Sequence, residues 1–183
     1  GKSSFIGRLL YDIGEIQEEK YRELKKASQK RGNEFEFAFL LDALQDERDQ
    51  GITIDTTRIF FKTKKRKYVF IDAPGHKEFI RNMITGAASA DIAILIVDVN
   101  EGIKQQTKKH SYLLKLLGFD KVITLYNKMD KVNYSKHKFL DVKFKLETFL
   151  SKLGIKSYSS IPISSREGDN IVTLSKRMVW YKG

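Results

Sequence analysis

Residues 122–130 read VITLYNKMD, a short apolar run that gives way to a polar tetrapeptide. The run at 122–127 is rich in apolar and β-branched side chains, and its short length favours a buried strand. The tetrapeptide at 127–130 then lies where that strand ends, and residues 134–153 have the spacing of an amphipathic helix. This order predicts a strand–loop–helix unit with polar side chains at the carboxyl end of the strand.

The same alternation of strands and helices extends over the whole chain. We expect further strands at 56–62, 67–72, 91–99 and 159–163, and helices at 5–13, 35–44, 79–88 and 104–117. Residues 15–31 are polar and charged, which predicts a surface helix or a mobile excursion. The alternation predicts an α/β fold, a mostly parallel sheet with helices on both faces and one antiparallel hairpin strand. In such a sheet, ligands bind outside the carboxyl ends of the strands.

The composition is that of an ordinary folded protein, with 41% apolar and 31% charged residues among 183. No apolar run approaches the roughly 20 residues that cross a bilayer, so no membrane association is expected. The absence of cysteine excludes disulfides and Cys-ligated zinc and is compatible with the cytoplasm. The net charge of +11 has two explanations, a polyanionic partner such as RNA or a Lys-rich solvated surface.

The first residues match the end of a phosphate-binding loop. Gly1-Lys2-Ser3 fits the last three positions of the pattern G-x-x-x-x-G-K-[ST], and Ser4 continues into a predicted helix. Backbone amides at such a helix N-terminus cradle phosphate oxygens. Lys2 would reach the β- and γ-phosphates, and Ser3 would ligate Mg²⁺. We expect residues 1–183 to form a single nucleotide-binding domain, truncated at the start of this loop.

The segment DAPGH at 72–76 follows the strand expected at 67–72. The Asp72 carboxylate can hold a magnesium-bound water, and the Gly75 amide can approach a γ-phosphate because no side chain intervenes. His76 could orient the attacking water. Upstream, Thr53 of the segment GITI can complete the magnesium shell when the γ-phosphate is present.

The tetrapeptide NKMD has the chemistry of a guanine reader. Asp130 can accept two hydrogen bonds, from the N1–H and the 2-amino group of guanine, and adenine lacks both donors. Asn127 would tether neighbouring loops, and the aliphatic stem of Lys128 would cover the base. A second loop follows the last expected strand, and one of its backbone amides can contact the guanine oxygen; its residues are Ser164, Ser165 and Arg166.

These four motifs, GKS, GITI, DAPGH and NKMD, occur in an order that resembles the translation-factor class of P-loop GTPases over the whole chain. The resemblance implies GTP and GDP as ligands, Mg²⁺, and a His that positions water. It also implies two β-barrel domains after the GTPase domain.

Within this class, two families are similar to the chain. The segments at 40–61 and 97–119 look more like the GTP-binding large subunit of bacterial ATP sulfurylase (sulfate adenylyltransferase), although Ala73 stands where that family often has Thr. That resemblance implies a heterodimer with a small catalytic subunit, and coupling of GTP hydrolysis to the formation of adenylyl sulfate from ATP and sulfate. The alternative is an elongation factor that delivers aminoacyl-tRNA to the ribosome.

Overall fold

The fold comes from a computed structural model that describes residues 1–30, 35–41, 43, 57–63, 65–72 and 90–183. The chain divides into two compact units, one formed by Lys2–Ala90 and the other by Gly1 with Asp91–Gly183. Each unit is described by itself below.

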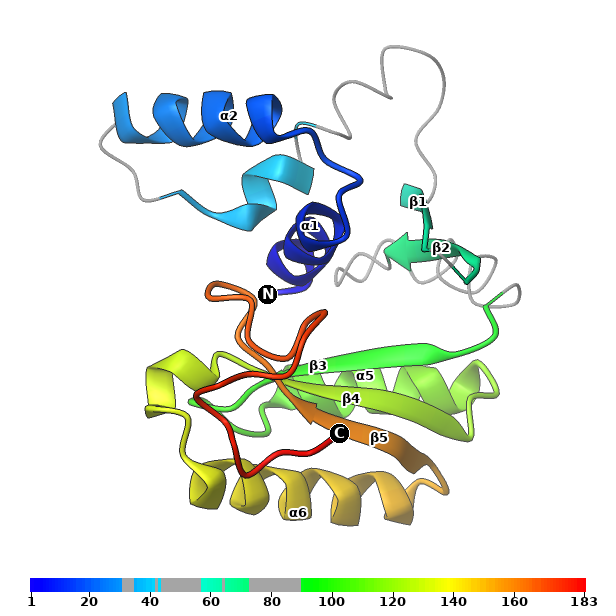
Figure 1. Cartoon of the computed structure of the whole chain (residues 1–183). Coiled ribbons are helices and arrows are strands. Elements are labelled where there is room, and N and C mark those ends of the chain that lie inside the picture. The colour runs from blue at the N-terminus through cyan, green and yellow to red at the C-terminus, as the bar shows by residue number, and fades with distance from the viewer. Residues whose placement is uncertain (31–34, 42, 44–56, 64, 73–89) are drawn as a thin grey trace. The chain divides into compact units, whose positions relative to one another are not determined.

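The unit Asp91–Gly183 is a parallel α/β structure. Its strands are β3 (Ala93–Asp98), β4 (Lys121–Asn127) and β5 (Lys156–Pro162), and its helices are α5 (Gln105–Leu116), η2 (Met129–Val132, a 3-10 turn) and α6 (Lys136–Lys152). The strands lie side by side in the order β3-β4-β5, and both pairings are parallel (Figure 1). The register places Asp98 beside Asn127, and Tyr126 beside Pro162. The three carboxyl ends therefore lie at the same edge of the sheet.

Helices α5 and α6 cover the same face of this sheet. Right-handed crossovers that advance in one direction place successive helices on one side. The contact between Tyr112 of α5 and Phe149 of α6 agrees, with ring centroids 5.8 Å apart in an edge-to-face arrangement. The N-terminus of α6 is capped by Ser135, whose hydroxyl accepts a hydrogen bond from the Lys138 N–H at 3.2 Å. Gly154, with φ of 69°, follows the end of the helix in a conformation that favours glycine.

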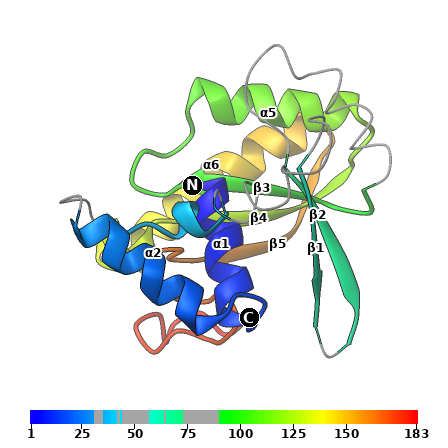
Figure 2. The same ribbon diagram turned by 90° about the horizontal axis from the view of Figure 1, so that it is seen from above.

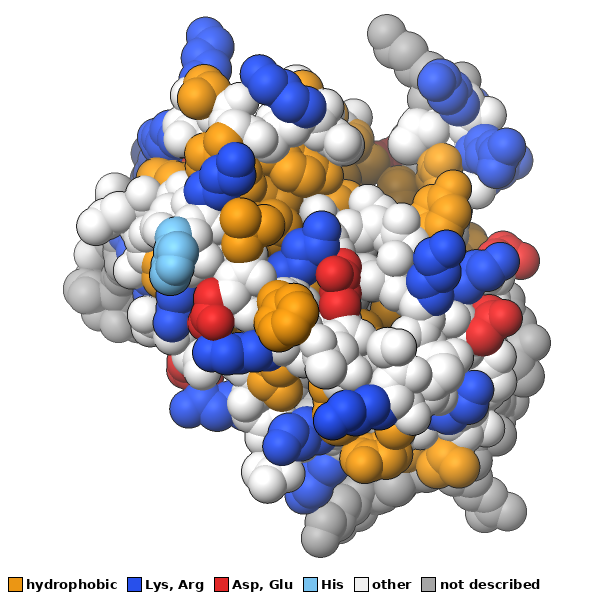
Figure 3. All heavy atoms as spheres, turned by 90° about the horizontal axis from the view of Figure 1, so that it is seen from below, with side chains coloured by type: hydrophobic (Ala, Val, Ile, Leu, Met, Phe, Trp, Pro, Cys, Tyr) orange, Lys and Arg blue, Asp and Glu red, His pale blue; other side chains and the backbone are white. Residues whose placement is uncertain are grey.

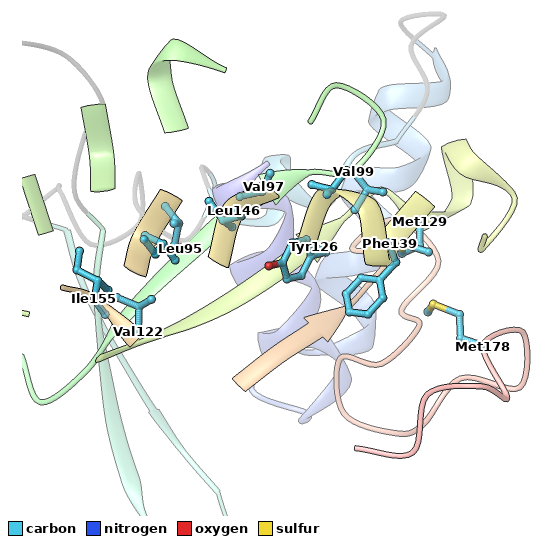
Figure 4. Close-up of a cluster of buried hydrophobic side chains, with 13 residues drawn as sticks. Leu95, Val97, Val99, Val122, Tyr126, Met129, Phe139, Leu146, Ile155 and Met178 are labelled. Carbon is cyan, nitrogen blue, oxygen red and sulfur yellow. The ribbon is translucent and has the colours of Figure 1, made fainter. Parts of the chain in front are cut away.

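The core of this unit lies between the sheet and α6 (Figure 4). Leu95 and Val97 alternate with more exposed residues along β3, as expected for a strand with one face buried. The ring of Tyr126 meets that of Phe139 edge to face, with centroids 5.0 Å apart. Leu146 and similar side chains are fully buried, and each contributes roughly 1.5–3 kcal/mol to stability.

The unit Lys2–Ala90 contains helices α1 (Lys2–Asp12) and α2 (Glu18–Lys30), and further helical residues at 37–41 and 43. Aromatic rings pack between these helices, and they belong to Tyr11, Tyr21, Phe35 and Phe37. Gly7 allows this packing, because a Cβ at that position would lie only 2.1 Å from the carbonyl oxygen of Phe37.

The same unit contains an antiparallel hairpin of β1 (Thr57–Lys62) and β2 (Lys67–Asp72), which Figure 2 shows as a long two-stranded ribbon. The Phe61 ring stacks on those of Tyr68 and Phe70, with centroids 5.2 Å and 4.8 Å apart. These three side chains line one face of the hairpin, as the pairing register requires.

The α/β fold class predicted from the sequence is confirmed. The polar segment predicted as a helix or an excursion is a helix, α2. Strand β5 begins at Lys156, earlier than the expected residue 159, because polar residues at its start made it read as a loop. There the Ser157 and Thr124 hydroxyls hydrogen bond to each other at 2.8 Å, so polar side chains hold the two strands together. The helix predicted at 79–88 lies outside the described residues.

Lys and Arg side chains are scattered among hydrophobic and uncharged ones on the face shown in Figure 3. On this face, the distribution is that of a Lys-rich solvated surface. Within the described residues, no helix combines the length and the apolar character that a bilayer-crossing segment requires.

Candidate functional site

Polar residues converge where β4 and β5 end. The backbone links the two strand ends directly: the Ile163 N–H donates to the Tyr126 carbonyl at 2.8 Å, and the Met129 N–H donates to the Ile163 carbonyl at 3.1 Å. On the other side of β4, the Val99 N–H donates to the Asn127 carbonyl at 3.0 Å. The loops after three parallel strands are thereby fixed to one another at the edge where ligands bind in sheets of this type.

Asn127 joins the two polar loops. Its side-chain oxygen accepts hydrogen bonds from the Lys128 N–H at 2.7 Å and from the Ser165 N–H at 3.0 Å. The residue is only 3% exposed, so both amides would be costly to leave unpaired. The sequence predicted a tether at Asn127, and the structure has these two bonds at that position.

Asp130 is oriented by the second loop. The buried Ser164 hydroxyl donates to a carboxylate oxygen of Asp130 at 2.6 Å and accepts from the Glu167 N–H at 3.2 Å. Asp130 itself is half-buried. An ionised carboxylate has about four acceptor sites, so one such bond leaves Asp130 able to accept others. The sequence predicted a role for one backbone amide of this loop and did not predict this function of the Ser164 hydroxyl.

Lys128 is held in an unusual position. Its backbone is left-handed, with φ of 68° and ψ of 36°, and its ammonium forms an ion pair with the Asp98 carboxylate at 2.5 Å. The hydrogen bond to Asp98 raises the pKa of Lys128, and burial opposes this shift. The side chain is therefore held at its ammonium end, which suits the predicted role of its aliphatic stem as a cover for a planar ring.

Asp98 is a further residue of the site, and it lies outside the motifs predicted from the sequence. Its carboxylate also accepts bonds from the Asn100 N–H at 2.9 Å and the Glu101 N–H at 3.3 Å. Asp98 is the last residue of β3, which pairs with β4, the strand that ends at the first residue of NKMD. An acidic residue at such a position is the signal that could have revealed it.

The remaining residues of the loop after β5 differ in burial. Ser165 is 3% exposed, and its hydroxyl has no hydrogen-bond partner among the described residues. A buried hydroxyl of this kind is costly unless a ligand or water satisfies it. Arg166 is exposed and pairs with Glu167 at 3.7 Å.

The predicted phosphate-binding residues lie at the start of α1. The helix begins at Lys2, and the positive end of a helix dipole is a favourable place for an anion. Lys2 is exposed, and Ser3 and Ser4 are half-buried. Gly1 precedes the helix and would accept a Cβ without a clash.

Several predicted residues are outside the reach of the structure. Thr53, Gly75 and His76 lie outside the described residues, so their assignments as metal ligand, phosphate contact and water-positioning group remain predictions. Asp72 is the last residue of β2, where its backbone is paired with that of Thr57. Its place at a strand end agrees with the prediction.

The sequence matches the family described as elongation factor Tu GTP binding domain over residues 1–181. It is 46% identical to elongation factor 1-alpha of Pyrococcus furiosus over all 183 residues, and 45% identical to that of Thermococcus celer. In both cases the chain spans 42% of the relative's length.

Two solved structures are also similar to the chain. The S. cerevisiae Ski7 GTPase-like domain, bound to GDP and inorganic phosphate, has a TM-score of 0.73 at 24% identity. That match covers 100% of this chain and 44% of the other, and at this identity it shows the fold alone. A bacterial selenocysteine-specific elongation factor has a TM-score of 0.53 at 33% identity, covering 71% of this chain and 22% of that one.

These matches correct the family chosen from the sequence. The prediction of a sulfate adenylyltransferase subunit is wrong, because the relatives that match the whole chain are named elongation factor 1-alpha. Nothing supports the small catalytic subunit as a partner. The resemblance over the segments at 40–61 and 97–119 is therefore outweighed by the match over all 183 residues.

Proposed function

Because the chain belongs to the family of elongation factor Tu GTP-binding domains, we propose that it is the GTP-hydrolysing domain of a translation elongation factor of the 1-alpha type. On this proposal, the whole protein carries aminoacyl-tRNA to the ribosome while GTP is bound and releases it after hydrolysis. The chain spans 42% of such a relative, so the tRNA contacts would involve more of the protein than this domain.

The observation that carries the proposal is the joined pair of loops after β4 and β5. Asn127 ties them through the Ser165 N–H, and Ser164 holds Asp130 from the opposite loop. A carboxylate fixed in this way can accept from both the N1–H and the 2-amino group of guanine. Adenine offers neither donor, so it would leave Asp130 unpaired, and unpaired polar groups give strong discrimination.

The buried hydroxyl of Ser165 supports a ligand at this place. It belongs to the loop proposed to contact the guanine oxygen, and it has no partner among the described residues. The Lys128 stem, fixed at its ammonium end by Asp98, would cover one face of the base. Both features suit a planar, polar-edged ring.

The triphosphate would lie against the start of α1, with Lys2 at its β- and γ-phosphates. The oxygen donors proposed for the metal are Ser3, Thr53 and Asp72, and hard oxygen ligands are those that Mg²⁺ prefers. When bound, Mg²⁺ neutralises charge that develops on the phosphate oxygens. His76 would orient a water for in-line attack on the γ-phosphorus, so that one P–O bond forms as the bond to GDP breaks.

The nucleotide proposal is tested by comparing bases. We expect the full-length protein to bind GDP and GTP about 10⁴-fold more tightly than ADP and ATP, the discrimination typical of a site built on hydrogen bonds. Titration with fluorescent analogues of all four nucleotides measures this ratio. Equal affinity for guanine and adenine nucleotides would refute the proposal.

The tRNA part needs a separate test. Aminoacyl-tRNA should be retained with GTP but not with GDP, and its affinity should fall steeply as salt rises because phosphate contacts release counterions. Filter binding at several salt concentrations measures both effects. Deacylated tRNA is the matched control, and equal retention of the two tRNA forms would contradict the proposed cargo.

A further inference from the structure

The segment that follows the loop of Ser164 and Ser165 folds back onto the loop. The Ser164 N–H donates to the Asp169 carbonyl at 3.1 Å, and the Gly168 N–H donates to the Ser164 carbonyl at 2.8 Å. The Asp169 carboxylate accepts from the Ser175 hydroxyl at 2.6 Å, and the Ser175 N–H donates to the Asn170 side chain at 2.7 Å. Residues 167–175 therefore form a hydrogen-bonded support beneath the loop.

Arg177 stands where this support meets the other polar loop. One guanidinium nitrogen, Nη1, donates to the Tyr134 hydroxyl at 2.6 Å and lies 3.2 Å from the Asp169 carboxylate and 3.5 Å from that of Glu167. The guanidinium also lies 5.3 Å from the centre of the Tyr134 ring. One side chain thus bridges residues that follow β4 and residues that follow β5.

Tyr134 has a strained backbone. Its φ is 55°, and that of its neighbour Asn133 is 49°, values that bulky side chains rarely adopt. Such strain persists where the surroundings fix it, and it is common at ligand clamps. Here the Tyr134 N–H donates to the Met129 carbonyl at 2.8 Å, and its carbonyl accepts from the indole N–H of Trp180 at 3.1 Å. With the bond from Arg177, Tyr134 is held at three points.

Two routes of direct contact therefore lead from Arg177 towards Asp130. One passes through Asp169 to Ser164, whose hydroxyl donates to the Asp130 carboxylate. The other passes through Tyr134 to Met129, the residue before Asp130. We propose that Arg177 is a positioning residue that fixes both guanine-reading loops at once and so sets the selectivity and residence time of the nucleotide. This inference rests on the proposed function.

The expected effect is moderate. The Arg177 side chain is 52% exposed, and exposed ion pairs are screened by water. Arg177→Ala should speed GDP release roughly three- to fivefold, the size expected of a partly exposed network. It should also lower the preference for GDP over inosine diphosphate (IDP). The base of IDP is hypoxanthine, which lacks the 2-amino group that a well-placed Asp130 would bind. A role confined to folding would shift both nucleotides equally.

The test uses the full-length protein with fluorescent GDP release, GDP and IDP affinities, and the melting temperature without nucleotide. Arg177→Lys should restore part of the effect, because an ammonium keeps the positive charge beside Asp169 but loses the planar guanidinium that lies over the Tyr134 ring. Tyr134→Phe removes one acceptor, and its effect should not add to that of Arg177→Ala. Lys176→Ala removes the same charge from an exposed neighbouring site and should match the wild type.

The outcomes separate this inference from the proposed function. Wild-type protein without selectivity for GDP over ADP would overturn the proposed function and the role of Arg177 with it. A selective wild type with an Arg177→Ala variant whose GDP release and GDP-to-IDP ratio are unchanged would overturn only the inference. Equal losses for GDP and IDP with a lowered melting temperature would also overturn it, as they indicate a folding role.

Discussion

The residues proposed to read the base and those proposed to hold the phosphates differ in how far the chain itself fixes them. Asn127 and Ser164 are buried, and their side chains hydrogen bond within the protein. Lys2 is exposed at the start of a helix, where its proposed partner is a phosphate. The side chains proposed to read the base are therefore held in place by the folded chain, whereas Lys2 would gain its proposed partner only with the ligand. Mutations should separate the two kinds of residue.

The largest expected effect is on base choice. Asp130→Asn should change the ratio of the affinities for GDP and xanthosine diphosphate (XDP) by about 10⁴-fold in favour of XDP. The new amide can donate to the second carbonyl of xanthine, and it cannot accept from guanine as the carboxylate does. Competition binding with both nucleotides measures the ratio. Asp141→Asn on α6 is the matched control, and a variant of Asp130 that still prefers GDP would show that another group reads the base.

The next effect concerns the phosphate residues alone. Lys2→Ala should weaken GDP and GTP binding by about 100-fold, because a charged partner of the phosphates is lost. The free energy of unfolding without nucleotide should change by less than about 0.5 kcal/mol, as for other exposed sites. Calorimetric titration measures the nucleotide affinity, and urea unfolding measures the free energy of unfolding. A large loss of stability in the absence of nucleotide would break the contrast between the two groups of residues.

Asn127→Ala should show the opposite behaviour. It removes the acceptor of two backbone amides, one of them on the buried Ser165, so unfolding without nucleotide should become easier by roughly 1–3 kcal/mol. Urea unfolding of the nucleotide-free protein measures this loss. The exposed Asn100, changed to Ala, serves as the control. Unchanged stability in the Asn127 variant would mean that the tether forms only when nucleotide is bound.

The smallest effect concerns the core beneath the site. Burial raises the pKa of Tyr126 to about 12, although the nearby Thr124 and Ser160 hydroxyls partly oppose this. Because the folded pKa lies above the ordinary value near 10, the contribution of the neutral phenol is complete below pH 10 and is lost as pH rises towards 12. Tyr126→Phe should be nearly neutral at pH 7, within about 1 kcal/mol, and should unfold less readily than wild type above pH 10. Thermal unfolding at pH 7 and pH 11 tests this, and identical alkaline losses in both proteins would exclude Tyr126 as their source.

The parts that sequence could predict are those set by short-range pattern. The strand at Lys121–Asn127 and the tether at Asn127 follow from an apolar run and a polar residue at its end. The roles of Asp98 and the Ser164 hydroxyl could not be found this way, since each depends on a partner from another strand end. The role of Arg177 could not be predicted from a local pattern either, because its hydrogen-bond partner Tyr134 lies 43 residues away in the sequence. The choice between related families failed because the motifs predict nucleotide chemistry that both families share. They do not predict which macromolecule the protein acts with.

The fluorescence of Trp180 reports on the turn at Tyr134. Trp180 is the only tryptophan among these 183 residues, so ultraviolet emission of this domain excited at long wavelength comes from a single, known position. Its ring lies 5.4 Å from that of Phe139, and its indole N–H is bound to the Tyr134 carbonyl. Loosening of the strained turn at Tyr134 would expose the indole and shift its emission to the red. Trp180 can therefore serve as a label-free fluorescent reporter next to the loops that would bind the base.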